Sequence, residues 1–311
     1  MADTEKALEI QAESEKKNRI LFIVNPVAGT MRSRTEMFTV VNIFCKAGYL
    51  VNVAVTQKRG HATELAQQAD PEEYDIIVCC GGDGTLNETL TGLMRSGKRI
   101  PLGYIPAGST NDFAQTLGIP TDPEKAAKAI LKKKPFTIDV GLFNGNSYFS
   151  YVASFGAFTS TSYSVPQEIK NTLGHLAYIL GGIRDLTTIA SYKISLNADG
   201  RQYSDTYIFG AICNTRSIAG MLKLPVGDES LHDGKLEILL VKKPESLIEL
   251  SDMITGITTS DYTGPMFTYF KASRVEISMG KKLSWSLDGE KKDGDSTVVI
   301  EAVKNAVELY R

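Results

Sequence analysis

Four short apolar runs alternate with stretches of helical periodicity in the first part of the chain. The runs are rich in β-branched residues and have the length of buried strands. The predicted strands cover residues 19–24, 49–55, 76–80 and 100–105, and the predicted helices cover 35–47, 60–68, a segment after 87, and 123–134. This alternation predicts an α/β fold with a mainly parallel, doubly wound sheet.

The pattern changes near Pro135, where the apolar runs become shorter and turn residues separate them. Closely spaced strands of this kind predict an antiparallel β-sandwich or barrel. Two helical stretches, 173–186 and 246–257, interrupt them, and residues 197–200 have the composition of a hairpin turn. The predicted strands are 137–141, 142–143, 148–149, 192–196, 203–212, 235–241, 274–277, 283–287 and 297–301.

These patterns predict two domains behind a charged N-terminal lead. The lead is 1–18, the α/β domain is 19–136, and the β-sandwich domain is 137–299. A chain of 311 residues is long enough for two hydrophobic cores.

Composition narrows the classes of partner. The net charge of −2 argues against nucleic acid, because binding to a phosphate backbone favours a basic surface. The sequence has no apolar run near the ~18 residues of a transmembrane segment, so membrane contact is expected to be peripheral. The four cysteines show no paired spacing, and the N-terminus has no signal-peptide pattern, which together favour a cytoplasmic protein.

The most informative segment is the glycine-rich turn Gly81-Gly82-Asp83-Gly84-Thr85-Leu86-Asn87-Glu88, which directly follows the strand at 76–80. Adjacent glycines expose backbone N–H groups, and a helix that starts there adds unpaired donors and a partial positive charge. A glycine pair alone is more often a tight strand-to-helix connection. The Asp, Thr, Asn and Glu in the same turn shift the interpretation to a phosphate-handling site.

Three further turns follow the other strands of this domain, at 25–30, 56–61 and 106–113. Turns after successive parallel strands meet at one edge of the sheet, where ligands bind. No Gly-Lys-Ser/Thr follows the glycines, so this is not a P-loop. The Gly-Gly-x-Gly spacing also differs from the Gly-x-Gly-x-x-Gly dinucleotide fingerprint.

Taken together, the four turns resemble the diacylglycerol kinase catalytic-domain family, which includes soluble bacterial lipid kinases and is related to sphingosine kinases and NAD kinases. The resemblance covers nearly the whole chain after Arg19. It implies that the α/β domain binds ATP, that the β-sandwich domain binds lipid, and that residues 300–311 return to the first domain. The residues that it assigns to the nucleotide are Asn25, Pro26, Val27, Ala28, Gly29, Thr56, Gly81, Gly82, Asp83, Gly84, Thr85, Leu86, Asn87, Ser109 and Asp112.

The resemblance also assigns catalytic roles in the segment Trp285-Ser286-Leu287-Asp288-Gly289-Glu290. Asp-Gly after a strand is by itself a common hairpin turn. In the family, the matching Asp is the proposed general base, and a carboxylate within hydrogen-bond reach can take the proton of a lipid hydroxyl. Glu290 is expected to orient Asp288 or a bound metal.

A structural Mg²⁺ is implied at a second acidic segment, where the family uses two acids three residues apart and a backbone carbonyl. The matching positions are Ser230, Asp233 and Lys235, so the first acid is missing, although Asp228 or Glu229 could substitute for it through a shifted loop or a water molecule. An exposed acidic turn is the alternative interpretation. A separate catalytic Mg²⁺ is expected with the ATP phosphates, near Asp83 or Asp112.

The resulting hypothesis is a lipid kinase that transfers the γ-phosphate of ATP to a membrane lipid, with diacylglycerol as acceptor and phosphatidic acid as product. Other lipid alcohols (undecaprenol, a sphingoid base or a glycolipid) stay open as acceptors. An NAD kinase-type enzyme and a lipid- or nucleotide-binding protein without turnover are the rival hypotheses. By family analogy, a homodimer is possible.

Overall fold

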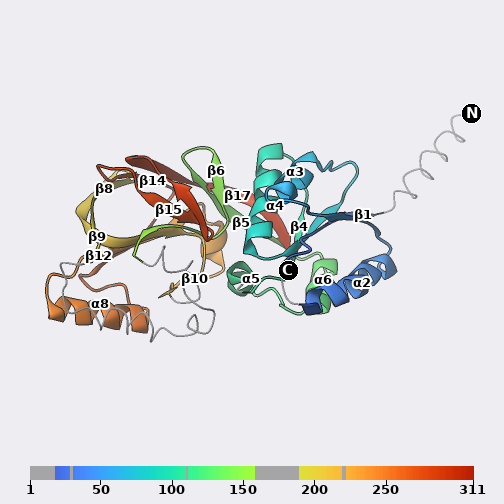
Figure 1. Ribbon diagram of the computed structural model, residues 1–311, viewed down its shortest axis with the longest axis horizontal. Coiled ribbons are helices and arrows are strands. Elements are labelled where there is room, and N and C mark those ends of the chain that lie inside the picture. The colour runs from blue at the N-terminus through green and yellow to red at the C-terminus, as the bar shows by residue number, and fades with distance from the viewer. Residues whose placement is uncertain (1–17, 29–30, 110, 158–188, 219–221) are drawn as a thin grey trace, which may run out of the picture.

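The computed structural model describes residues 18–28, 31–109, 111–157, 189–218 and 222–311. The chain forms two lobes that lie side by side, with the N-terminal lobe on the right in Figure 1 and the C-terminal lobe on the left. The predicted helix at 173–186, the predicted nucleotide residue Gly29 and the lead before residue 18 lie outside the described residues.

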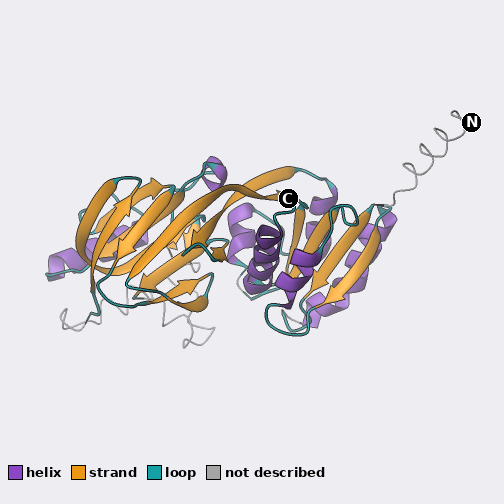
Figure 2. Cartoon of the chain, turned by 90° about the horizontal axis from the view of Figure 1, so that it is seen from above, coloured by secondary structure: helices purple, strands orange, loops and turns teal. Residues whose placement is uncertain are grey.

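The N-terminal lobe is built on four parallel strands in the order β2-β1-β3-β4. Helices cover both faces of this sheet, as Figure 2 shows from above. The strands are β1 (Arg19–Val24), β2 (Leu50–Val55), β3 (Ile76–Gly81) and β4 (Leu102–Pro106), and the helices are α2 (Met31–Lys46), α3 (His61–Gln68), α4 (Asp83–Ser96), α5 (Asp112–Leu117) and α6 (Pro123–Leu131).

Strand β1 shows why the predicted strands are apolar throughout. Ile20, Phe22 and Val24 belong to a core cluster with α2 and α6, whereas Leu21 and Ile23 belong to another with α3, α4 and α5. Because a sheet with helices on both faces buries both sets of side chains, its strands lose the polar alternation of a half-exposed sheet.

The helix predicted after residue 87 starts earlier than expected, at Asp83, and the short helix α5 was not predicted.

The C-terminal lobe is antiparallel and encloses a separate core of aliphatic and aromatic side chains around the fully buried Trp285. The predicted combination of a parallel-sheet lobe and an antiparallel sandwich is confirmed. Its strands are β5 (Pro135–Phe143), β6 (Ser147–Phe149), β7 (Val152–Gly156), β8 (Tyr192–Ala198), β9 (Arg201–Cys213), β10 (Ser217–Ile218), β11 (Leu222–Lys223), β12 (Leu236–Lys242), β13 (Phe267–Ala272), β14 (Arg274–Ser278), β15 (Ser284–Leu287) and β16 (Glu290–Asp293), with the helical segments η4 (Glu229–His232) and α8 (Leu247–Thr259).

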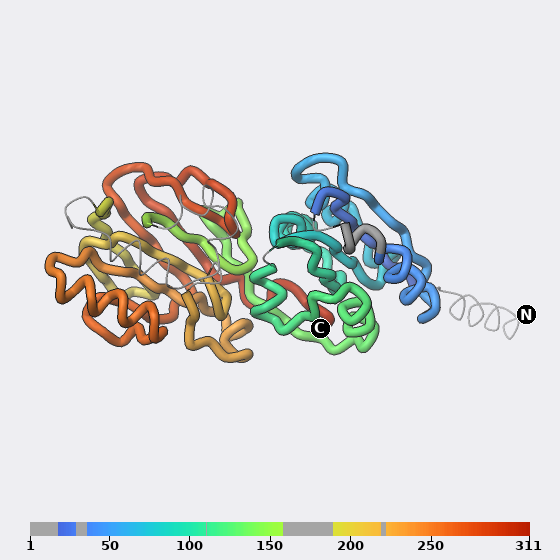
Figure 3. Tube along the Cα trace, turned by 60° about the horizontal axis from the view of Figure 1, so that its bottom comes forward, coloured from blue at the N-terminus to red at the C-terminus, as the bar shows by residue number. Residues whose placement is uncertain are grey.

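One long strand, β17 (Thr297–Tyr310), runs through both lobes, as the red tube in Figure 3 shows. It pairs antiparallel with β14 and β5, and its end pairs parallel with β4 through Leu309 and Leu102. The pairing with β5 shifts register between Val303 and Val307. This strand therefore joins the two sheets by backbone hydrogen bonds. In the part of the chain that is described, no helix has both the length and the apolar character needed to cross a membrane.

Candidate active site

A cleft of about 780 Å³ lies at the carboxyl edge of the parallel sheet, and its walls come from both lobes. The turns that follow β1, β2, β3 and β4, called the first to fourth turns in that order, contribute to it, together with the β15–β16 hairpin. The lining residues are Asn25, Pro26, Val27, Ala28, Thr56, Gln57, Lys58, Arg59, Gly82, Asp83, Gly84, Thr85, Glu88, Gly108, Ser109, Asp112, Tyr151, Asp288 and Glu290.

Most of the residues that were predicted to contact the nucleotide line this cleft. Gly81, Leu86 and Asn87 do not. Gly81 is the last residue of β3, and Leu86 is fully buried in the core. Leu86 therefore supports the turn by packing in the hydrophobic core.

The first and third turns are joined by a side-chain hydrogen bond. Asn25 donates from Nδ2 to Oγ1 of Thr85 over 2.8 Å, and its Oδ1 accepts from the backbone N–H of Val27 over 3.1 Å. One amide thus fixes the turn after β1 against the first turn of α4 and shapes the floor of the cleft.

Glycine at positions 82 and 108 is explained by the close approach of two turns. A Cβ atom on Gly108 would lie 2.7 Å from Cα of Gly82. The φ angle of Gly82 is −85°, so the requirement is for space and not for a left-handed backbone. Asn111, with φ 52°, holds the turn after β4 by accepting from the N–H of Gly108 and donating to its carbonyl, each over 2.9 Å.

Asp83 connects the third and fourth turns. Its carboxylate accepts from the backbone N–H groups of Asp112 (3.1 Å) and Phe113 (3.3 Å) at the start of α5. Burial raises the pKa of Asp83, and these backbone hydrogen bonds oppose the rise. Asp83 and Asp112 thus both line the cleft, and the carboxylate of Asp83 contacts the backbone of Asp112.

The second turn brings positive charge to the cleft. Lys58 and Arg59 line it, and sequence reasoning did not select either, although two adjacent cations between Thr56 and Gly60 were a visible signal. Glu88 holds this turn from α4 by accepting from the N–H groups of Gly60 (2.8 Å) and Ala62 (3.3 Å). The last residue of the glycine-rich turn therefore caps helix α3.

Asp288 enters the cleft from the C-terminal lobe. It occupies the left-handed region (φ 47°) and is followed by Gly289 (φ 87°), the geometry of a two-residue hairpin turn between β15 and β16. The turn is docked on the corner between β6 and β7, because the N–H of Asp288 donates to the carbonyl of Val152 over 2.9 Å. Asp288 thus lies in a hairpin turn and also lines the cleft.

Four donors surround the Asp288 carboxylate. Oδ2 accepts from the N–H (2.5 Å) and the hydroxyl (2.7 Å) of Ser150, and Oδ1 accepts from the N–H groups of Tyr151 (3.0 Å) and Val152 (2.9 Å). The residue is only 5% exposed. Burial raises the pKa of Asp288 to about 6, because the cost of desolvating the charge exceeds the gain from these hydrogen bonds.

Comparison with known proteins agrees with this arrangement. Residues 19–143 match the model of the diacylglycerol kinase catalytic domain, and residues 153–311 match that of the YegS C-terminal NAD kinase β-sandwich-like domain. The diacylglycerol kinase of Bacillus subtilis (strain 168) is 35% identical over 88% of this chain and 90% of its own length. That of Staphylococcus aureus (strain MRSA252) is 34% identical over 88% of this chain and 86% of its own.

The chain belongs to the diacylglycerol kinase family. It is an ATP-dependent lipid kinase. A solved structure from Bacillus anthracis str. Sterne, provisionally described as a diacylglycerol kinase, superposes with a TM-score of 0.78 at 27% identity and covers 95% of both chains. The family resemblance inferred from the four turns is thereby confirmed.

The contacts of Glu290 in this family member differ from the expected ones. Its carboxylate forms an ion pair with Arg59 over 2.6 Å, across the cleft from the second turn, and both side chains are about half exposed or more. Exposed pairs of this kind contribute about 0–1 kcal/mol. The Asp288 carboxylate is held instead by the backbone N–H groups of residues 150–152 and the hydroxyl of Ser150.

The implied structural Mg²⁺ ligands lie outside the cleft. The ammonium of Lys271 donates to Oγ of Ser230 (2.7 Å) and to Oδ2 of Asp233 (2.9 Å). The N–H of Lys235 donates to the other oxygen of Asp233 over 2.9 Å. No group of three His, Cys, Asp or Glu residues suited to a metal occurs within the described ranges. A lysine thus occupies the space between the oxygen atoms that were expected to bind metal.

Proposed function

We propose that this kinase transfers the γ-phosphate of ATP to the hydroxyl of diacylglycerol and releases phosphatidic acid and ADP. One observation carries the proposal. A single cleft combines the four turns of the ATP-type lobe with a buried carboxylate whose pKa of about 6 suits a general base. The named relatives in two species support diacylglycerol as the acceptor.

The nucleotide phosphates are proposed to lie over the turns at Gly82 and Gly108, where missing side chains leave the backbone accessible. Lys58 and Arg59, which also line the cleft, supply positive charge from the turn after β2. The carboxylates of Asp83 and Asp112 are oxygen ligands of the kind that Mg²⁺ prefers, so they are the proposed partners of a nucleotide-bound Mg²⁺. Bound there, that ion would neutralise charge on the transferred phosphoryl group.

Asp288 is the proposed base for the acceptor. The lipid oxygen attacks the γ-phosphorus, the bond to the β-phosphate oxygen breaks, and the hydroxyl proton passes to the Asp288 carboxylate. A carboxylate has about four acceptor positions, and all four are used by Ser150, Tyr151 and Val152. The Ser150 hydroxyl is the one donor that can rotate away and make room for the substrate hydroxyl.

The test is a kinase assay with labelled ATP and mixed micelles that contain one candidate acceptor each. Diacylglycerol, undecaprenol, a sphingoid base, a glycolipid and soluble NAD form the panel, and the labelled product is identified by mass. We expect labelled phosphatidic acid at a rate at least about tenfold above that of any other product, since recognition of a few polar groups supplies that discrimination. Faster labelling of another acceptor would replace diacylglycerol in the proposal. ATP turnover that is unaffected by every lipid would reject it.

Such a substrate resides in a bilayer, so we also propose that the kinase works as a peripheral protein at the cytoplasmic membrane face. Co-sedimentation with phospholipid vesicles that contain diacylglycerol, compared with vesicles that lack it, tests this. Binding to neither would contradict the proposal.

A further inference from the structure

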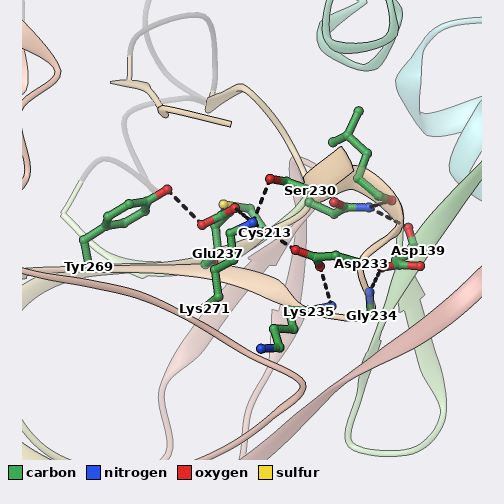
Figure 4. Close-up of polar contacts among 11 residues, drawn as sticks. Asp139, Cys213, Ser230, Asp233, Gly234, Lys235, Glu237, Tyr269 and Lys271 are labelled. Atoms are coloured by element: carbon green, nitrogen blue, oxygen red, sulfur yellow. Dashed lines mark hydrogen bonds and ion pairs between the residues drawn. The ribbon is translucent and has the colours of Figure 1, made fainter. Parts of the chain in front are cut away.

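The ammonium of Lys271 lies at the centre of a small polar cluster in the C-terminal lobe, which Figure 4 shows. Lys271 projects from β13, and its three acceptors come from η4, its C-terminal cap and β12. They are Oγ of Ser230 at 2.7 Å, Oδ2 of Asp233 at 2.9 Å and Oε1 of Glu237 at 3.1 Å. An ammonium has three N–H donors, so every donor of Lys271 is matched by one acceptor.

The cluster is more than a surface ion pair because one of its carboxylates is buried. The Glu237 side chain is only 4% exposed, whereas those of Asp233 and Lys271 are about one-third exposed. The remaining oxygen of Glu237 accepts from the hydroxyl of Tyr269 over 2.8 Å. Burial of a carboxylate is costly unless the charge is paired and hydrogen-bonded, and Lys271 and Tyr269 together satisfy both conditions.

Two carboxylates thus pair with the single ammonium of Lys271. Its Nζ lies 2.9 Å from Oδ2 of Asp233 and 3.1 Å from Oε1 of Glu237. The cluster therefore joins one basic side chain to two acidic ones.

The loop that carries Ser230 and Asp233 also contacts β5 and β17, the strands that connect the two lobes. The N–H of Gly234 donates to Oδ2 of Asp139 over 2.6 Å, and the other oxygen of Asp139 accepts from the N–H of Asn305 over 2.7 Å. Asp139 lies on β5, and Asn305 lies at the register shift of β17. A contact that holds this loop in place therefore also stabilises β17 at its register shift, where the strand passes toward the parallel sheet.

The family resemblance implies a divalent cation at this loop, but the residues present do not fit one. Serine replaces the first acid at position 230, which removes a charged ligand. The ammonium lies between the oxygens of Ser230 and Asp233, where a divalent ion would need to bind, and like charges repel. Mg²⁺ also requires near-octahedral oxygen coordination, which a neighbouring ammonium would disrupt.

We propose that the Lys271 ammonium takes the place of the structural divalent cation in this chain, and holds the loop at 228–236 against β12 and β13 without a metal. A fixed side-chain cation then lies where the resemblance implies a bound ion, beside a serine where it implies an acid. The inference does not depend on the acceptor lipid or on the role of Asp288.

Thermal unfolding of the full chain without nucleotide tests the proposal directly. The midpoint is measured in EDTA and in millimolar Mg²⁺, for the wild type and for Asp233→Asn. We expect any shift caused by Mg²⁺ to be equal in the two proteins, because ions bound in the ATP cleft do not involve Asp233. A Mg²⁺ shift of several degrees in the wild type that disappears in Asp233→Asn would overturn the proposal, because it would identify the cluster as a metal site.

A Lys271 variant with a matched control tests whether the ammonium stabilises the loop. Lys271→Met removes the ammonium, keeps the apolar stem and leaves the buried Glu237 without its cation, so we expect the midpoint in EDTA to fall by roughly 3–8 °C. Lys242→Met is the control, because Lys242 is 34% exposed and pairs with the more exposed Asp205 over 2.9 Å. Its midpoint is expected to fall by less than about 2 °C.

Equal midpoints for Lys271→Met and the wild type would overturn the proposal, since the ammonium would then support nothing. If Lys271→Met does not fold, Lys271→Arg provides the same comparison with the charge retained. Its midpoint is expected to lie within about 3 °C of the wild type, with no response to Mg²⁺ beyond that of Asp233→Asn. A larger Mg²⁺-induced shift of the midpoint in Lys271→Arg than in Asp233→Asn would reject the proposal that a fixed cation replaces the metal.

Discussion

Two Asp-Gly turns of the C-terminal lobe have nearly the same local structure and different surroundings. Asp199 and Asp288 both have φ 47°, and the glycines that follow have φ 85° and 87°. Each carboxylate accepts from the N–H and the hydroxyl of one serine and from the next backbone N–H along the chain. For Asp199 these donors are Ser273 (2.8 Å for both) and Arg274 (3.0 Å), and for Asp288 they begin with Ser150.

The pKa values of the two carboxyl groups shift in opposite directions. Asp199 is exposed. Desolvation is the largest single influence on its pKa, but the hydrogen bonds from Ser273 and Arg274 together outweigh it, and the pKa is lowered. Asp288 is buried, and desolvation raises its pKa to about 6 although it accepts one more hydrogen bond. The turn itself therefore makes a rigid hairpin, and burial at the cleft between the lobes is what makes one of the two carboxylates suited to accept a proton near neutral pH.

The largest expected difference between the turns is in catalysis. Asp288→Asn keeps the size of the side chain and removes the base, so we expect kcat for lipid phosphorylation to fall by about 10²–10⁴-fold with ATP affinity nearly unchanged. Asp199→Asn alters the matched turn away from the cleft and should keep kcat within about twofold. Steady-state kinetics with calorimetric ATP titration measures both.

Asp288→Asn activity above a few per cent of the wild type would remove Asp288 from the base role. Equal losses in the two asparagine variants would indicate that the hairpin turns matter only for folding.

The sequence predicted the turns well and their surroundings poorly. Strands β1, β3 and β4 were visible because burial on both faces makes their side chains apolar, and the Asp-Gly pairs at 199 and 288 carry their own turn signal. The burial of Asp288 depends on β15 pairing with β7, through Trp285 and Phe155, some 130 residues apart. No local pattern encodes such a pairing, so the assignment of Asp288 came from family resemblance.

Contacts between elements that are distant in the sequence were also missed elsewhere in the molecule. Lys271 lies on β13, a strand that was not predicted, and its acceptors come from other elements that approach it only in the folded chain. Glu88 was grouped with the phosphate turn, but α4 packs against α3 so that its carboxylate caps the N-terminus of α3. Residue types within one turn were thus predictable, and partners across elements were not.

The second expected difference is in pH dependence. A base must be ionised, and burial raises the pKa of Asp288, so the rate should be lost as the pH falls through about 6 and should be constant above it. Well below pH 6 we expect a tenfold decrease in kcat/KM for the lipid per pH unit, because kcat/KM reports the pKa of the free enzyme. Asp199→Asn should reproduce the wild-type profile, because Asp199 is ionised throughout this range. A profile that is flat from pH 5 to 8 would contradict the raised pKa of a catalytic Asp288.

The smallest expected effect separates titration of Asp288 from titration of ATP itself, whose phosphates ionise in a similar range. Ser150 is a positioning residue, and its hydroxyl stabilises the ionised form of Asp288 by a hydrogen bond of 2.7 Å. In the free enzyme, where the Ser150 hydroxyl still contacts Asp288, Ser150→Ala should therefore raise the pKa of Asp288. The acid limb of the kcat/KM profile, which reports the free enzyme, should move upward by roughly 1 unit, because a hydrogen bond to a charged group is worth about 1.5 kcal/mol or more. Activity at pH 8 should stay within about threefold of the wild type. Ser273→Ala makes the same change at the matched turn and should leave the profile in place. An acid limb that does not move in Ser150→Ala would show that the titrating group is ATP and not Asp288, since the serine cannot shift the ionisation of a free nucleotide.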